Sequence, residues 1–281
     1  MAIKIAICAI IKKENLYLRE WVEYHKNIGF DKIIIYDNND VNGELPHTVI
    51  GDYIEAGFVD IYNVRGLKLF DNGESLQDKT YNQCLDEYNN QFEWIAFIDI
   101  DEFITIPNLS DIHQLFENFD THEVDQILMS WYIIGDNGNL FYENKPVTER
   151  FTQGCPACFT DKRACELTHY IKSIVRTSAS RDNNKMNCHS LFGVPSIHDM
   201  KYKCDGYGWQ SITSYDNIYV RHYITKSLTE ALSGPWLDPN LDINHIMRRI
   251  DDYKILNGWP DMHETILNNV LKYKKIIDKC K

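Results

Sequence analysis

The chain has 281 residues, of which 44% are hydrophobic and 25% are charged, and it contains 14 glycines. This composition excludes a disordered, collagen-like or disulfide-framework protein and indicates one large globular domain with an appendage. Acidic residues outnumber basic residues by 41 to 29, so the formal net charge is −12. Because such a field repels a nucleic-acid backbone, no nucleic-acid partner is expected.

The first eleven residues, MAIKIAICAII, form a short apolar run that lysines follow directly. We interpret this run as a buried strand rather than a signal peptide or a membrane span. Without an export signal, the eight cysteines are expected to be reduced thiols in a cytoplasmic protein. Two interpretations remain open for Cys155, Cys158, Cys165 and Cys188: a small zinc site or ordinary buried thiols.

Strands and helices alternate in the first half of the chain. Four apolar runs have the length of buried strands: 3–11, 32–36, 58–62 and 94–100. Apolar residues recur at helical spacing from Leu18 to Ile28, and a second helix begins with a capping-box-like pair at Ser75 and Asp78. This order predicts an α/β fold whose mixed, mainly parallel sheet is flanked by helices, with ligands at the carboxyl ends of the strands.

The pattern changes after residue 125. Short β-like segments separated by polar loops predict a mixed or antiparallel completion of the sheet over 126–228. We therefore divide the domain 1–228 into a first half (1–125) and a second half (126–228), followed by a C-terminal helical segment (229–281). Lysines recur near the end of that segment, which is typical either of a helix resting on an anionic membrane or of a solvated helix face.

Asp99 and Asp101 end the most apolar run and form the only D-x-D triplet of the sequence. Residues two apart in an extended strand project from the same side, so both carboxylates are expected to face one cation. Mn²⁺ or Mg²⁺ prefers oxygen ligands and keeps positions that a diphosphate can fill. The alternative interpretation is a solvated turn.

Six segments of the chain, spread over residues 5–228, resemble one family. They are IAICAIIKKENLYLREWVEYHKNIGFDKIIIYDNND, DKTYNQCLDEY, WIAFIDIDEF, VTERF, YIKSIVR and RHYITKSL. Together they resemble the family-2-like glycosyltransferases with a GT-A fold, in the branch allied to family 92. The resemblance implies transfer of a sugar from a nucleotide-activated donor to an acceptor hydroxyl, with inversion at the anomeric carbon. It assigns binding of the nucleotide-sugar to residues 1–125, which we call the donor half, and binding of the acceptor to residues 126–228, the acceptor half.

The resemblance also implies where the nucleoside of the donor binds. The loop after the first strand would place Ala9, Ile11 and Glu14 near it. Asp37 would accept a hydrogen bond from the base or ribose, because a carboxylate at a strand end suits an N–H or hydroxyl donor. The alternative for Asp37 is an Asx-turn that begins the following loop.

Cationic and polar side chains are candidates for the diphosphate and the metal. Lys79, Asn82 and Arg65 are expected near the donor, with a solvated surface as the alternative. Lys172 is a further donor-binding candidate. His222, in RHYITKSL, would reach back to the metal with Asp99 and Asp101, since imidazole is a competent ligand.

The acceptor half supplies the remaining candidates. His189 and Trp209 are assigned to the acceptor, because a tryptophan face can stack on a sugar ring. An inverting transfer needs a base for the acceptor proton, and we choose Glu149, with a salt bridge to Arg150 as the alternative. Other carboxylates of this half stay open as bases: Asp136, Asp199 and Asp205.

These observations predict a metal-dependent glycosyltransferase. The resemblance implies that it moves a hexose from a UDP-sugar, with UDP-galactose as the first candidate. The expected acceptor is a glycan or lipid-linked glycan in surface or capsular polysaccharide or lipooligosaccharide synthesis. The enzyme would act in the cytoplasm, with possible peripheral contact to the inner face of the membrane through the basic C-terminal helix. The alternatives are a nucleotidyltransferase or phosphohydrolase with the same acidic metal site, and a glycan-binding protein without turnover.

Overall fold

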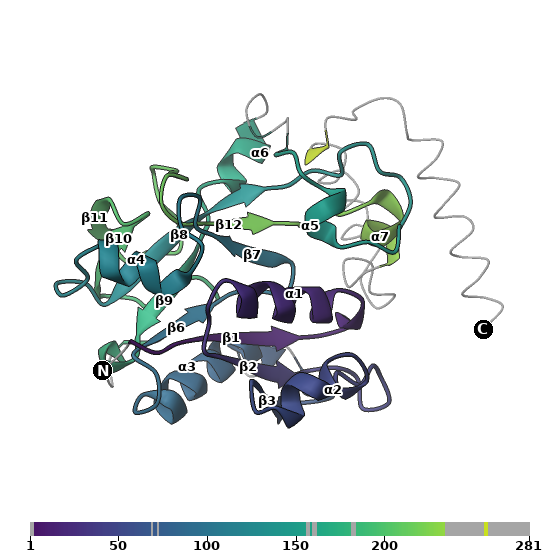
Figure 1. Cartoon of the computed structure of the whole chain (residues 1–281), viewed down its shortest axis with the longest axis horizontal. Helices are drawn as coiled ribbons and strands as arrows, with labels where there is room; N and C mark the ends of the chain where they lie inside the picture. The colour runs from purple at the N-terminus through teal and green to yellow at the C-terminus, as the bar shows by residue number, and fades with distance from the viewer. Residues whose placement is uncertain are drawn as a thin grey trace.

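The computed structural model describes residues 3–233, with gaps at 69, 72, 156–157, 159–161 and 181–183, and residues 256–257. Most of the predicted C-terminal helical segment, with its lysines, lies outside the described residues, which include only 229–233 and 256–257 of it. Within the described part, none of the helices is both long and apolar enough to cross a membrane. Figure 1 shows the arrangement of the elements.

The donor half follows the predicted alternation. In chain order its elements are β1 (Ile5–Ile11), α1 (Asn15–Asn27), β2 (Lys32–Asp37), α2 (His47–Glu55), β3 (Val59–Asn63), the two short strands β4 (Phe70–Asp71) and β5 (Glu74–Ser75), α3 (Leu76–Tyr88), β6 (Trp94–Phe97), β7 (Glu102–Thr105) and α4 (Ile112–Asn118). The two expected helices are confirmed. Gly29 ends the first with a φ of +96°, and the Ser75 hydroxyl caps the second by accepting the Asp78 N–H at 3.4 Å.

The acceptor half consists of strands joined by long loops. Its elements are β8 (Gln126–Ile133), α5 (Val147–Arg150), α6 (Lys162–Leu167), β9 (Ile171–Arg176), the 3₁₀-helix η2 (Thr177–Ala179), β10 (Pro195–His198), β11 (Tyr202–Asp205), β12 (Tyr219–His222) and α7 (Leu228–Ser233). The strand segments predicted within 126–225 are confirmed. The family-like VTERF segment forms the short helix α5.

One sheet joins both halves. In the described residues its strand order is β11-β10-β8-β9-β6-β1-β2-β3, and β12 pairs with both β7 and β8. The pairings from β6 through β1 and β2 to β3 are parallel, whereas β9 is antiparallel to β6 and β8. The predicted mixed, mainly parallel sheet flanked by helices is therefore confirmed.

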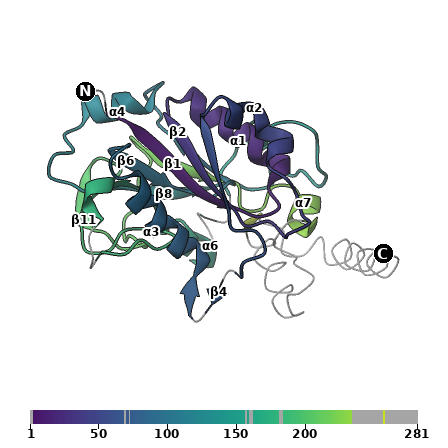
Figure 2. The same cartoon turned by 90° about the horizontal axis from the view of Figure 1, so that it is seen from below.

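Helices cover the two faces of the parallel strands. Ile7, Ala9 and Ile11 point to the face where α1 buries Leu18 and Trp21. The alternate residues of β1 face α3 and its buried side chains, which are Tyr81, Cys84, Leu85 and Tyr88. Figure 2 shows α1 and α2 on one side of the strands and α3 on the other. Both faces of β1 are thus closed to solvent, and a ligand has access only at the strand ends.

Candidate active site

The site begins at a turn between β6 and β7. β6 ends at Phe97, the Glu102 N–H donates to the Asp99 carbonyl at 3.1 Å, and the Glu102 carboxylate accepts the Asp99 N–H at 2.8 Å. The expectation that Asp99 and Asp101 sit on one extended strand is therefore wrong, because the side chain of Glu102 closes a turn at this point. We call residues 99–102 the acidic turn.

The carboxylate of Asp99 is held by two side chains from different elements. Its Oδ1 accepts the Gln77 amide at 2.8 Å, and its Oδ2 accepts the Lys172 ammonium at 2.7 Å. Lys172 is 1% exposed and also donates to the Cys188 carbonyl at 3.1 Å. Burial by itself lowers the pKa of Lys172, but Asp99 and Glu102 outweigh it and raise that pKa above its usual range.

Asp101 faces cationic groups of the acceptor half. Its Oδ1 lies 3.6 Å from His222 Nε2, and its Oδ2 lies 3.9 Å from Lys226 Nζ. Burial opposes ionisation of Asp101, but His222 and Lys226 outweigh it and hold the pKa of Asp101 below its usual range. Burial likewise opposes protonation of His222, and the carboxylate of Asp101 is the main reason that the pKa of His222 is nevertheless raised. Asp101 is therefore ionised, as a metal ligand must be.

The loop that follows β1 brings a further carboxylate to the acidic turn. Removal from water raises the pKa of Glu14 to about 8, with Lys226 opposing the increase and Asp101 and Asp99 adding to it. Lys226 has a φ of +53°, a conformation that non-glycine residues rarely adopt. Its ammonium packs on the Tyr17 ring at 4.6 Å from the centroid, which fixes the side chain near Asp101.

The predicted nucleoside residues lie at the ends of β1 and β2. Asp37 forms an Asx-turn: its Oδ1 accepts the Asn39 N–H at 3.0 Å, and its Oδ2 binds Arg65 Nη1 at 2.7 Å. Arg65 also donates to the carbonyls of Asp40 and Glu44, so it supports this loop. The side chains of Ala9 and Ile11 belong to the core, and only their backbone can meet a ligand.

Two donor candidates at the start of α3 have different surroundings. Asn82 exchanges two hydrogen bonds with the Met186 backbone, donating at 2.8 Å and accepting at 2.9 Å, so it fixes a loop of the acceptor half. Lys79 is exposed and forms no ion pair with the described residues. The structure does not bring either side chain to the acidic turn.

An aromatic surface extends from His222 into the acceptor half. The Trp131 ring lies 4.4 Å from the His222 ring and 5.4 Å from the Tyr170 ring. Tyr170 pairs through its backbone with Trp209, which is 50% exposed. We call Trp131, Tyr170 and Trp209 the aromatic shelf. His189 lies beside the shelf, 5.7 Å from Trp131, and burial lowers its pKa to about 4.

The predicted base is not part of this arrangement. Glu149 is exposed on α5 and makes no hydrogen bond or ion pair with the acidic turn in the described residues. Nor does it pair with Arg150, which instead forms a bidentate pair with Glu230 at 2.7 Å for both bonds. Asp199 was another candidate base. Its carboxylate accepts four hydrogen bonds from the 214–218 segment and holds that loop in place.

The four thiols considered for zinc have different surroundings. Cys155 and Cys158 are buried in a small apolar cluster with Ile133, Cys165 is exposed, and the Cys188 carbonyl serves Lys172. Across the residues that the structure describes, no three His, Cys, Asp or Glu side chains are grouped as metal ligands.

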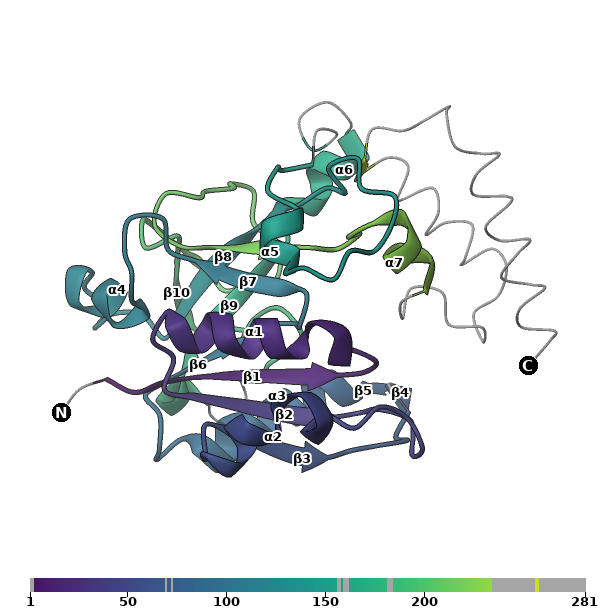
Figure 3. The same cartoon turned by 45° about the vertical axis from the view of Figure 1, so that its right-hand side comes forward.

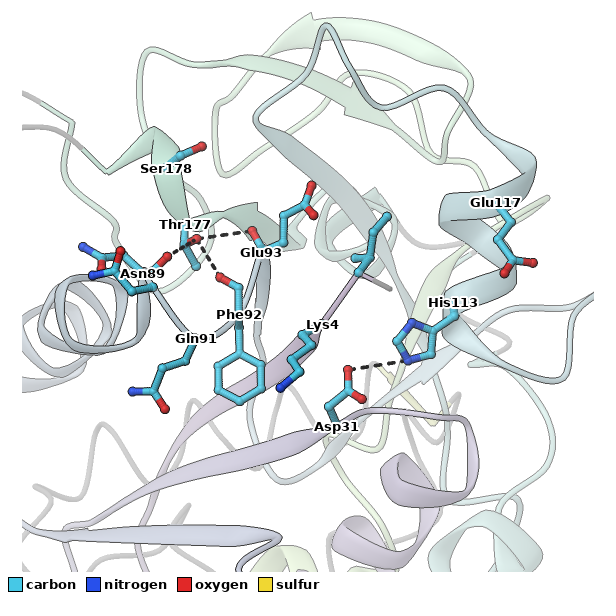
Figure 4. Close-up of a pocket in the computed structure, with 12 residues that line it drawn as sticks. Lys4, Asp31, Asn89, Gln91, Phe92, Glu93, His113, Glu117, Thr177 and Ser178 are labelled. Carbon is cyan, nitrogen blue, oxygen red and sulfur yellow. Dashed lines mark hydrogen bonds and ion pairs between the residues drawn. The ribbon is translucent and has the colours of Figure 1, made fainter. Parts of the chain in front are cut away.

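A hollow of about 1140 Å³ lies at the other end of the strands. It is lined by the residues that precede β1, β2 and β6, namely Lys4, Asp31 and Glu93, together with His113 (Figure 4). Ligands of parallel sheets bind at the carboxyl ends of the strands. The acidic turn lies at that end, so we place the site there and not in this hollow.

The donor chemistry at Asp101 and His222 fits a divalent cation. Two atoms that each lie about 2.1 Å from one ion are roughly 3 to 4 Å apart, depending on the angle between them. Asp101 Oδ1 and His222 Nε2 are 3.6 Å apart, within this range. A carboxylate oxygen and an imidazole nitrogen both suit Mn²⁺. The carboxylate of Asp99, held by Lys172 and Gln77, lies on the same turn.

Sequence reasoning found most of these residues but gave no role to three of them. Gln77, Glu102 and Lys226 contact Asp99, His222 or Asp101. Two of them have a usable sequence signal: Glu102 directly follows the D-x-D triplet, and Lys226 lies in the family-like RHYITKSL segment. No signal in the sequence indicates Gln77, since a polar residue in the first turn of a helix is common.

A mixed sheet with an acidic turn at the carboxyl end of a central strand is the arrangement expected above for a glycosyltransferase. The sequence profile of glycosyltransferase family 92 matches residues 3–255, and the chain belongs to this family. A family 92 protein of Oryza sativa subsp. japonica is 26% identical over 213 residues, which cover 74% of this chain and 32% of that protein.

Galactan beta-1,4-galactosyltransferase GALS3 of Arabidopsis thaliana is 27% identical over 118 residues, covering 40% of this chain and 23% of its own length. The chain thus spans about a third or less of these curated relatives. Among solved structures, S. aureus TarS in complex with UDP-GlcNAc aligns with a TM-score of 0.43 and 14% identity, over 89% of this chain and 71% of that one.

Proposed function

We propose that the chain transfers a hexose from a UDP-sugar to a hydroxyl of a glycan acceptor, with inversion and with Mn²⁺ or Mg²⁺ bound at the acidic turn. Family membership supports the reaction class. The observation on which the proposal depends is that Asp101 faces His222 at 3.6 Å where β6 ends, with Lys226 beside them. Galactose is the first candidate sugar, because related Arabidopsis proteins are named galactosyltransferases.

Different residues would bind the cation, the diphosphate and the nucleoside of the donor. Asp101 and His222 would hold the cation, and Asp99 is kept in place by Gln77 and Lys172. A cation held there would supply positive charge next to the departing diphosphate. Lys226 is fixed near Asp101 and adds a positive charge on the same side. The backbone at the ends of β1 and β2, next to the Asp37 Asx-turn, would face the nucleoside.

The aromatic shelf is the proposed acceptor surface. Trp209 is exposed and yet held in place, because the neighbouring Gln210 N–H donates to the His169 carbonyl at 2.9 Å and the Trp209 ring packs on the His169 ring. A fixed, exposed ring offers a flat face for the C–H groups of a sugar. The shelf reaches His222 through Trp131, so an acceptor lying on it would approach the proposed cation site.

Some parts of the proposal come from the sequence alone. Glu149 remains the predicted base, and Glu149→Gln would test it by the loss of transfer with donor binding retained. A role in surface or capsular polysaccharide or lipooligosaccharide synthesis, a cytoplasmic location and membrane contact of the C-terminal segment also remain predictions.

The test is a donor panel with product analysis. The protein is incubated with UDP-galactose, UDP-glucose or UDP-GlcNAc, with and without MnCl₂, and with galacto-oligosaccharides as acceptors. Release of UDP together with a lengthened acceptor supports the proposal, and chelation with EDTA should abolish it. Formation of UMP and hexose 1-phosphate would instead indicate a phosphohydrolase. Binding without consumption of any donor would indicate a glycan-binding protein.

A further inference from the structure

Glu102 is the most buried carboxylate of the acidic turn, at 0% exposure. One of its oxygens, Oε2, is used twice: it accepts the Asp99 N–H at 2.8 Å and lies 3.5 Å from Lys172 Nζ. The other oxygen, Oε1, has no hydrogen-bond partner among the residues that the structure describes. A buried acceptor without a partner is costly, so its presence calls for an explanation.

A candidate hydrogen-bond partner for Oε1 is the imidazole of His222. Nδ1 of His222 lies 4.0 Å from Glu102 Oε1, is buried, and likewise has no hydrogen-bond partner in the described part of the chain. Two buried polar atoms, one able to donate and one able to accept, therefore face each other at slightly more than hydrogen-bond distance.

The sheet keeps these two residues opposite each other. β7 and β12 are antiparallel, and in their register His222 pairs directly with Glu102. The Tyr223 N–H donates to the Asp101 carbonyl at 2.8 Å and extends this pairing, while the Trp131 ring packs against the imidazole from the side. The register and the packing on Trp131 thus hold the two side chains next to each other within the fold.

We propose that Glu102 is the positioning residue of the proposed cation site. Its Oε1 accepts the Nδ1–H of His222 and thereby leaves the lone pair on Nε2, the nitrogen that faces Asp101. This inference rests on the proposed function, because it concerns the cation expected between His222 and Asp101. A neutral imidazole has one donor nitrogen and one acceptor nitrogen, and a carboxylate at the first decides which nitrogen binds a metal.

A purely structural role explains only part of the geometry. Pairing with Lys172 and closing the turn both use Oε2, and neither gives Oε1 or His222 Nδ1 a partner. The positioning role gives both atoms a partner with a movement of about 1 Å, from 4.0 Å to ordinary hydrogen-bond length.

The first test measures Mn²⁺ affinity in the presence of UDP, by titration calorimetry on the full chain. Glu102→Gln should weaken Mn²⁺ binding roughly 10- to 100-fold. In a His222→Ala background the same substitution should have little further effect, because the interaction is already lost. A loss of equal size in both backgrounds would overturn the proposal, since a structural role does not depend on His222.

Asp31→Asn is the matched control. Asp31 also accepts a backbone N–H, from Ile5 at 2.8 Å, and also faces a histidine, His113 at 3.5 Å, but at the opposite end of the strands (Figure 4). The substitution Asp31→Asn should therefore leave the Mn²⁺ affinity unchanged. If the wild-type protein binds no Mn²⁺ at all, the proposed function fails. If it binds Mn²⁺ and Glu102→Gln binds it equally well, only this inference fails.

A second measurement needs no variant of Glu102. In ¹⁵N-histidine-labelled protein saturated with Mg²⁺ and UDP, His222 should show a protonated Nδ1 and an unprotonated Nε2, with its signals assigned by their absence in His222→Ala. This readout stays decisive even if Glu102→Gln does not fold. A protonated Nε2 in the saturated protein would overturn the inference.

Discussion

The two halves of the chain are built from different interactions. In the donor half, parallel strands are buried on both faces by helices that follow them closely in sequence, and apolar side chains fill both layers. In the acceptor half, long loops are fixed by buried polar groups, such as Asp199 beneath the 214–218 segment and Arg150 against Glu230. Both halves contribute to the main apolar core, but the second half also depends on directional hydrogen bonds to buried polar groups.

The halves meet at the proposed site, each contributing one sign of charge. The donor half supplies the acidic turn and Glu14, whereas Lys172, His222 and Lys226 come from the acceptor half. This difference predicts that a substitution in the acidic turn lowers activity, while a substitution in the buried polar groups of the acceptor half lowers stability.

Asp101→Asn should give the largest effect. It removes the charge that faces His222 and Lys226 at a partly exposed turn, so transfer should fall about 10³-fold, or roughly 4 kcal/mol in activation free energy. Steady-state rates with UDP-sugar and Mn²⁺ measure this. Asp216→Asn is the control, because Asp216 forms a surface pair with Lys201 at 2.9 Å. Full activity of Asp101→Asn would exclude the metal assignment.

Arg150→Met tests the acceptor half. Arg150 and Glu230 are each 3% exposed, and Glu230 also accepts the Tyr17 hydroxyl at 2.9 Å, so the pair joins α5 and α7 to the start of α1 (Figure 3). Removing one partner of a buried pair leaves the other charge uncompensated, at a cost of about 3 kcal/mol in unfolding free energy. Urea denaturation measures it. Lys145→Met, at an exposed pair, should cost less than about 1 kcal/mol.

His25 gives the donor half a pH-dependent stability. Its Nδ1–H donates to the Trp21 carbonyl at 2.9 Å and its Nε2 accepts the Ile104 N–H at 3.3 Å, so the fold requires the neutral ring. Burial lowers the pKa of His25 to about 3. The unfolded chain therefore binds the extra proton below about pH 6.5, and stability is lost as the pH falls from 6.5 towards 3.

Between pH 7 and pH 5 this histidine should account for about 2 kcal/mol of lost unfolding free energy. His25→Gln, which keeps a donor and an acceptor but does not titrate, should remove that part of the pH dependence. Urea denaturation at the two pH values measures it. An unchanged pH slope in the variant would show that His25 does not titrate on unfolding.

Trp209→Ala should have the smallest effect. Loss of a sugar-stacking ring costs about 1 kcal/mol, so the KM for the acceptor should rise about fivefold. The KM for the donor and the free energy of unfolding should not change, since half of this side chain is exposed. Tyr142→Ala, an exposed aromatic residue that packs on Arg150, is the control. An unchanged KM for the acceptor would show that Trp209 does not bind it.

The donor half could be predicted well from the sequence because its signals are local. The apolar faces of α1 and α3 and the strands between them follow from periodicity. Two helices were not predicted. In α2 only Ile50 is buried, so its periodicity is weak. α4 has a usable signal, since Asp111 caps it by accepting the His113 N–H at 2.8 Å.

The candidate site was predicted in its residues but not in its geometry. Asp99, Asp101, Lys172 and His222 were all expected, but their pairing depends on the register of β12 against β7 and on the turn that Glu102 closes. Both are long-range or side-chain features that residue spacing does not encode. For the same reason the sequence could not show that Arg65 binds Asp37 and the carbonyls of the following loop.

The position of β12 has a consequence for the order in which the molecule is made. This strand inserts between β7 and β8, and its last residue, His222, is near the end of the described chain. During synthesis the strands of the donor half emerge first, and the His222 side chain emerges only after most of the acceptor half has been translated. A nascent chain that stops before Tyr219 therefore has a nearly complete sheet and no means of completing its cation site.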